Sequence, residues 1–145
     1  MDAYKYGVGG VWLSGIKTLS PIVWRLEWPQ EIVDAFTVGD LPINNLEMAG
    51  ILLHFIILDY LVDVKHCHVA IWCDNTLAVS WTMKLSSTKS VAGQQLTHAL
   101  TMRMSMAKSS PLAALSIAGK ENVMADLPSR SYNASAAPET MTGTI

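Results

Sequence analysis

Five stretches of the chain show a regular pattern of hydrophobic and polar positions. In residues 20–28 large apolar side chains occupy alternate positions, which predicts a half-buried antiparallel strand. In residues 46–64 apolar side chains recur at spacings of three and four, which predicts a long helix that is buried on more than one side. Residues 91–107 show a similar helical pattern. The short apolar runs 69–73 and 111–118 predict two further strands.

The remaining segments complete the order of elements. Residues 2–13 predict a strand remnant, a glycine-rich turn and a second strand, and residues 31–36 and 77–84 predict short helices. The main elements are then three strands, a helix, a strand, two helices, a strand and a short terminal helix. This order predicts an α/β domain over residues 1–131, with a mixed five-stranded sheet, antiparallel strands first and parallel strands after, flanked by helices. Residues 132–145 are expected to form a disordered tail.

The composition limits the class of protein. The 145 residues suffice for one domain with its own core, and their net charge of −2 argues against a strongly basic, non-specific nucleic-acid binder. The longest apolar run is too short to span a bilayer, and residues 1–5 lack the pattern of a signal peptide. The 2 cysteines give no disulfide framework. We therefore expect an intracellular protein of the cytoplasm or nucleus, with no membrane partner.

Four carboxylates lie at the ends of predicted elements: Asp2, Glu47, Asp74 and Asp126. The first strand, the long helix and the central strand form a βαβ unit, which can bring the first three to one edge of the sheet. Clustered carboxylates need a compensating cation, and hard oxygen ligands suit Mg²⁺ or Mn²⁺. Two such ions about 3.5–4 Å apart catalyse phosphodiester hydrolysis in two-metal enzymes. Asp74 has a simpler alternative role, as a cap of the helix that follows it.

Several motifs occur along the chain in a fixed order, and together they cover residues 2 to about 131. They are Asp2-Ala-Tyr-Lys-Tyr-Gly-Val-Gly-Gly-Val11, Ile43-Asn-Asn-Leu-Glu-Met48, Trp72-Cys-Asp-Asn-Thr-Leu-Ala-Val79, the polar segment Lys84-Leu-Ser-Ser87 and Gly119-Lys-Glu-Asn-Val-Met-Ala-Asp-Leu-Pro-Ser-Arg130. In this order and spacing the motifs resemble the ribonuclease H domain of retrotransposon reverse transcriptases, of the gypsy and DIRS types, in the RNase H-like superfamily.

The resemblance implies a metal-dependent endonuclease that cleaves the RNA strand of RNA–DNA hybrids. It selects RNA through the 2′-hydroxyl and the groove shape. A polymerase domain of a parent polyprotein is the implied protein partner. Asn45 and Asn75 have helix capping as an alternative role. The implied catalytic and metal-binding residues are Asp2, Glu47, Asp74 and Asp126, and the implied substrate-binding residues are Asn45, Asn75, Lys120 and Asn122.

The start of the chain departs from the family pattern. Only Met1 precedes Asp2, so we expect a truncated first strand and an exposed sheet edge, through which the chain could form a homo-oligomer. Two other functions therefore stay open. One is a catalytically impaired remnant of the same fold that binds nucleic acid or protein. The other is an ATPase-like or DNA-cleaving member of the wider superfamily.

Two further groups of residues have structural interpretations. His66 and His68 flank Cys67 and would share one face of a strand, but no further ligands accompany them, which disfavours a metal site. The tryptophans are expected to pack in the core, with Trp81 as the exception that could stack on a base.

Overall fold

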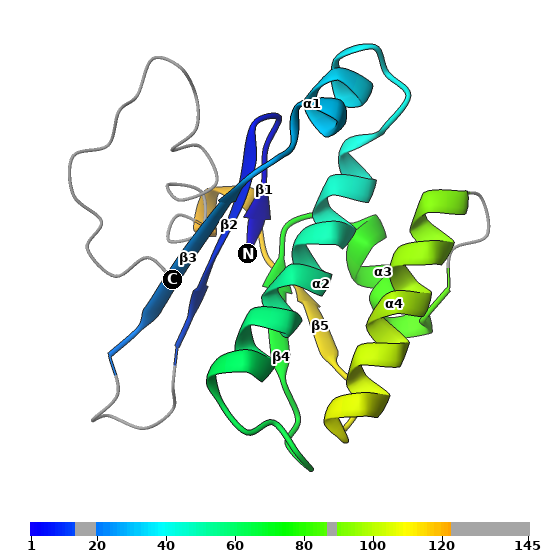
Figure 1. Ribbon diagram of the computed structural model, residues 1–145. Coiled ribbons are helices and arrows are strands. Elements are labelled where there is room, and N and C mark those ends of the chain that lie inside the picture. Colours follow the sequence, from blue (N-terminus) through cyan, green and yellow to red (C-terminus); the bar gives the residue numbers. More distant parts are fainter. Residues whose placement is uncertain (14–19, 87–89, 123–145) are drawn as a thin grey trace.

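The computed structural model describes residues 1–13, 20–86 and 90–122. These residues form a mixed α/β structure in which an initial antiparallel sheet is followed by two helices, a strand, two helices and a further strand (Figure 1). The expected terminal helix near Pro128 and the expected tail 132–145 lie outside the described residues. The elements are β1 (Asp2–Ala3), β2 (Gly7–Trp12), β3 (Ile22–Glu27), α1 (Gln30–Thr37), α2 (Ile43–Leu61), β4 (Ala70–Cys73), α3 (Thr76–Lys84), α4 (Val91–Ala107), β5 (Ala113–Ser116) and a 3₁₀ turn, η1 (Gly119–Glu121).

Helix α2 forms the centre of the molecule. It packs against β1 and β2 on one side and against α3 and α4 on the other (Figure 1). Its Ile51 and Phe55 are fully buried, as are Val8 of β2 and Leu100 of α4. Burial on several sides explains why the sequence of α2 lacks a single polar face. None of the helices in the described part of the chain is long and apolar enough to cross a membrane.

The strands form two sheets. The order β1-β2-β3 is antiparallel, and β4 pairs with β5 in parallel. The α/β class and the antiparallel-then-parallel order agree with the sequence analysis, but the strands do not form one continuous five-stranded sheet. β1 pairs with β2 through Asp2 and Ala3 only. Between the sheets, the nitrogen of Met1 donates to the carbonyl oxygen of Trp72 at 3.0 Å, which places β1 beside β4. A two-residue strand is too short to form a ladder with β4.

Two expectations about individual residues were wrong. Trp72 is 51% exposed, because β4 buries alternate residues and turns its other face outward, whereas Trp81 is only 9% exposed. Helix α2 begins at Ile43, directly after Pro42, and not at residue 46. Proline has a fixed φ that suits the first turn of a helix. The helix can therefore begin at the residue that directly follows Pro42.

A buried hydrogen bond joins the first sheet to α2. The indole Nε1 of Trp24 donates to Nδ1 of His54 at 2.8 Å, and both side chains are buried. Burial lowers the pKa of His54 to about 3. The imidazole is therefore neutral at physiological pH, with Nδ1 as the acceptor.

This histidine makes the stability of the fold depend on pH. In the unfolded chain His54 titrates near its usual pKa of 6.5, so between pH 6.5 and about 3 the unfolded state binds a proton that the native state does not. The contribution of His54 to the free energy of unfolding should therefore fall as the pH falls through this window, by an amount on the order of a few kcal/mol.

Urea unfolding at pH 7 and pH 4.5 tests this prediction. In a His54→Gln variant, the amide oxygen can still accept from Trp24 but cannot bind a proton. We expect this variant to lose clearly less stability than the parent between the two pH values. An equal loss in both proteins would show that His54 does not contribute to the acid sensitivity.

Candidate metal centre

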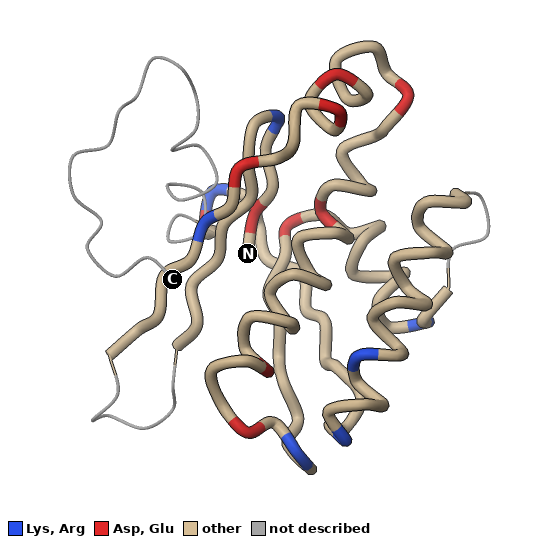
Figure 2. The backbone as a smooth tube through the Cα atoms, viewed as in Figure 1, with Lys and Arg blue, Asp and Glu red and all other residues tan. Residues whose placement is uncertain are grey.

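Three of the four carboxylates predicted from the sequence lie at one end of the molecule. Asp2 comes from β1, Glu47 from the second turn of α2, and Asp74 directly follows β4. In Figure 2, red acidic segments lie close to one another where β1, α2 and the end of β4 meet. Asp2 and Glu47 are buried, and Asp74 is half-buried. Asp126 lies outside the described residues.

Both carboxylate oxygens of Glu47 are contacted by neighbouring strands. The backbone nitrogen of Ala3 donates to Oε1 at 3.3 Å, and the Cys73 thiol donates to Oε2 at 3.6 Å. The thiol sulfur in turn accepts from the backbone nitrogen of Asn75 at 3.4 Å. Glu47 is thus fixed between β1 and β4, with only 3% of the residue exposed.

The electrostatic surroundings of Glu47 oppose its ionisation. Burial and, to a smaller extent, the charges of Asp2 and Asp74 together raise the pKa of Glu47 to about 8, against smaller opposing effects of its two hydrogen bonds. Burial also raises the pKa of the Cys73 thiol to about 12, with the charge of Glu47 contributing. In the absence of a cation, this site therefore favours a protonated Glu47 at neutral pH.

The donor set fits a divalent cation. One ligand atom each from Glu47, Cys73 and Asp74 lie within 4.8 Å of one another. The carboxylates are hard oxygen donors suited to Mg²⁺ or Mn²⁺, whereas a neutral thiol is a poor ligand for these ions. A cation would also offset the repulsion that raises the pKa of Glu47. Of these three residues the carboxylates are thus the better suited to hold such an ion, and the Cys73 thiol donates a hydrogen bond to Glu47.

Gly119 lies close to the carboxylate of Asp74. A Cβ atom at Gly119 would lie 3.0 Å from Oδ2 of Asp74. Any larger residue would crowd this oxygen. The missing side chain therefore allows the turn η1, which begins at Gly119, to lie directly beside the carboxylate.

A second layer of amide groups borders the carboxylates. Asn75 caps α3, because its Oδ1 accepts from the backbone nitrogen of Ala78 at 2.9 Å. Its amide nitrogen donates to Oδ1 of Asn44 at 2.8 Å. The capping interpretation of Asn75 is therefore confirmed. Asn44 was not identified from the sequence as a site residue, and its only sequence signal was its position three residues before Glu47.

The other residues that the resemblance singled out take different positions. Asn45 is not a cap: it is buried, and its Oδ1 accepts from Oγ of Ser90 at 3.2 Å, which ties α2 to the start of α4. Asn122 is also buried, and its amide donates to the carbonyl oxygen of Met1 at 3.0 Å, beside Asp2. Lys120 is exposed on η1.

Comparison with known proteins gives no family for this chain. No protein-family model, no curated protein and no solved structure matches it. Function must therefore be argued from the geometry and chemistry of the site.

Proposed function

We propose that this chain is a metal-dependent endonuclease of the ribonuclease H type, derived from a retrotransposon reverse transcriptase, that hydrolyses the RNA strand of RNA–DNA hybrids. The observation that carries the proposal is the group of ligand atoms from Glu47, Cys73 and Asp74, which lie within 4.8 Å of one another, with Asp2 of β1 near enough for its charge to raise the pKa of Glu47. The order of motifs around these three residues adds support. Mg²⁺ or Mn²⁺ at this edge would stabilise the charge that develops on the attacking and leaving oxygens of a phosphodiester.

The residues of the chain have distinct roles in this proposal. Glu47 and Asp2 form the buried side of the metal centre, and the half-buried Asp74 faces the substrate. Glu47 must lose its proton when the cation binds, so cation affinity should rise with pH up to about 8. Cys73 holds Glu47 in place through its hydrogen bond to Oε2.

The amide groups beside the acids are suited to binding a nucleic-acid backbone. Asn44 and Asn75 are half-buried next to Asp74, and an amide can both donate to and accept from a 2′-hydroxyl. In this proposal these two residues contact the sugars of the RNA strand. In the same proposal Lys120, which is exposed on η1, contacts a phosphate of the hybrid.

A cleavage assay tests the proposal. A hybrid with a labelled RNA strand is incubated with Mg²⁺ or Mn²⁺, beside the same duplex in which the RNA is replaced by DNA. We expect cleavage of the RNA strand only. Asp74→Asn keeps the shape of the side chain but removes a ligand charge, and we expect it to lower the rate by at least about a hundredfold, since such charge stabilisation contributes several kcal/mol.

The matched control is Asp40→Asn, which removes an exposed carboxylate from the loop before α2. Its rate should stay within about twofold of the parent rate, as expected for a solvated surface charge. Cleavage of the all-DNA duplex, or hydrolysis of a nucleotide, would instead support a DNA-cleaving or ATPase-like enzyme. Equal activity in Asp74→Asn and the parent would contradict the assignment of the site.

A second candidate function is a non-catalytic module of the same fold that binds nucleic acid or protein. The short β1 favours it, because Asp2 is positioned by only two paired residues. This module would bind the hybrid without cleaving it, and Mg²⁺ would not change its thermal stability. Measuring hybrid binding and Mg²⁺-dependent stability in the same samples distinguishes the two functions.

A further inference from the structure

The thiol of Cys73 adds a soft ligand to the candidate metal centre. Cys73 is the last residue of β4, and the alternation of buried and exposed residues along this strand turns it inward, where it is fully buried. Asp74 follows the end of the strand. One ligand atom of each of these residues and one of Glu47 lie within 4.8 Å of one another. A cation that prefers sulfur therefore has three ligands here, whereas Mg²⁺ prefers the two carboxylates.

The distance between the thiol and Glu47 fits a tetrahedral zinc ion. Zinc binds cysteine sulfur at about 2.3 Å and carboxylate oxygen at about 2.1 Å, and at a tetrahedral angle these bonds separate the sulfur from the oxygen by about 3.6 Å. Sγ of Cys73 and Oε2 of Glu47 are 3.6 Å apart. A zinc ion can therefore replace the thiol proton between these two atoms with little movement of either side chain.

The surroundings of the sulfur also suit a bound thiolate. Sγ of Cys73 accepts from the backbone nitrogen of Asn75 at 3.4 Å. A donor of this kind orients a metal ligand and stabilises the negative charge on it. Cys73 and Glu47 form the buried side of the group, and the half-buried Asp74 forms the side that borders the surface. Three protein ligands and a fourth position for water are a common arrangement around zinc.

We propose that Glu47, Cys73 and Asp74 bind Zn²⁺, or another divalent cation that prefers sulfur, and that this ion excludes Mg²⁺ from the candidate metal centre. On binding, the Cys73 thiol loses its proton to the solvent, and the sulfur forms a bond to the ion in its place. Both carboxylates are then engaged and no longer available to Mg²⁺. The ion would thus inhibit hydrolysis of the hybrid. This last consequence rests on the proposed nuclease function, whereas the binding of the ion does not.

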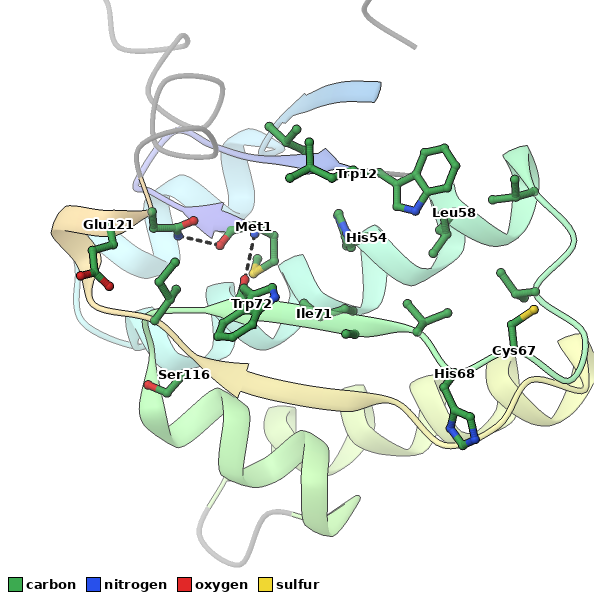
Figure 3. A pocket seen from close by; sticks show the side chains of 18 of the residues that line it. Met1, Trp12, His54, Leu58, Cys67, His68, Ile71, Trp72, Ser116 and Glu121 are labelled. Carbon is green, nitrogen blue, oxygen red and sulfur yellow. Dashed lines mark hydrogen bonds between the residues drawn. The ribbon is translucent and has the colours of Figure 1, made fainter. Parts of the chain in front are cut away.

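Co²⁺ is a spectroscopic probe for this site, because a bond between cobalt and a thiolate gives a charge-transfer absorption that carboxylate and histidine ligands do not give. The chain has 2 cysteines, so the Cys67→Ser variant retains Cys73 as its only thiol. Cys67 is exposed, and Figure 3 shows it well away from Met1 and Trp72, which lie beside the candidate metal centre. We expect the parent and Cys67→Ser to show the same absorption with one equivalent of Co²⁺, and Zn²⁺ to abolish it.

Two further variants, made in the Cys67→Ser background, test the carboxylate ligands. Asp74→Asn should bind Co²⁺ at least about tenfold more weakly, because it replaces a charged ligand by a neutral one. The matched control is Asp40→Asn, in the exposed loop before α2, which should bind Co²⁺ as the background does. One equivalent of Zn²⁺ should also raise the melting temperature of Cys67→Ser, and an excess of Mg²⁺ added afterwards should raise it no further.

Three results would overturn the proposal. The first is the absence of the charge-transfer absorption in folded Cys67→Ser, including the case in which the parent shows it, since the ion would then bind Cys67. The second is equal Co²⁺ affinity of Asp74→Asn and its background. The third is further stabilisation by Mg²⁺ after Zn²⁺ has bound. None of these measurements involves nucleic acid, so this site and cleavage of the hybrid can fail independently.

Discussion

In metal-free buffer at pH 8.5, the Glu47→Gln variant should be more stable than the parent protein by a few kcal/mol. The reason is the raised pKa of Glu47, about 8 against an ordinary value of 4.5. Between these two values the native state holds a proton that the unfolded state releases, so the stability of the parent falls as the pH rises through this window. Each pKa unit corresponds to about 1.4 kcal/mol. Glutamine has nearly the same shape as glutamate but cannot ionise. The stability of the variant therefore does not fall with rising pH for this reason.

The pH dependence distinguishes this effect from a general gain in packing. At pH 4.5 and below, Glu47 is protonated in the native state and the two proteins should differ little. The difference should grow steadily toward pH 8.5, which is still below the range in which the buried Cys73 thiol contributes. Other titrating groups, including His54, affect both proteins and cancel in the comparison. Thermal and urea unfolding of both proteins at intervals of one pH unit would measure the difference in their free energies of unfolding.

A divalent cation should reduce this difference in stability. Mg²⁺ at about 100 times its dissociation constant adds about 2.7 kcal/mol to a protein that binds it only in the folded state. We expect this gain in the parent at pH 8.5 and little or none in Glu47→Gln. The control is Glu27→Gln on the exposed end of β3, which should respond to Mg²⁺ as the parent does. A pH-independent difference between Glu47→Gln and the parent would contradict the electrostatic account.

The sequence predicted those helices and strands that are specified by patterns within their own residues, such as a helix cap or an alternation of apolar side chains. Helix α4 spans residues 91–107 as expected, because Ser90 caps it: its Oγ accepts from the backbone nitrogen of Gly93 at 2.9 Å. Strand β3 was also predictable from its alternating pattern. The exposure of Trp72 was not, since an apolar run looks the same in a strand covered on both faces and in one covered on a single face.

The candidate metal centre was predictable only in part. Carboxylates at the ends of a strand, a helix and the next strand are visible in the sequence, and the βαβ rule brings them together. The hydrogen bond from Cys73 to Glu47 spans 26 positions and that from Asn75 to Asn44 spans 31. Contacts of this range depend on how the elements pack, and no local pattern encodes them. For the same reason a capping or substrate role was expected for Asn45, whereas in the structure its side chain accepts a hydrogen bond from Ser90.

Gly10→Ala should destabilise the protein by about 3 kcal/mol, and a melting curve should show a large fall in the transition temperature. Gly10 pairs with Trp24 across β2 and β3, and its missing side chain leaves room for the Trp24–His54 hydrogen bond. An added Cβ would lie 2.5 Å from Nε1 of Trp24 and 2.7 Å from Nδ1 of His54. Overpacking costs about 1–3 kcal/mol, and a buried polar pair that loses its hydrogen bond costs a similar amount.

Two further variants establish that crowding is the cause. Gly39→Ala tests backbone strain alone, because Gly39 has a φ of +84° but nothing within 4 Å of the added Cβ, and it should cost only about 1 kcal/mol. Trp24→Phe removes the Nε1 atom that the new methyl group would meet. If crowding is the cause, Gly10→Ala should cost at least about 1 kcal/mol less in the Trp24→Phe background than in the parent. Equal costs in both backgrounds would place the effect in the backbone of β2, and the close approach of Trp24 and His54 would then not be the reason for glycine at this position.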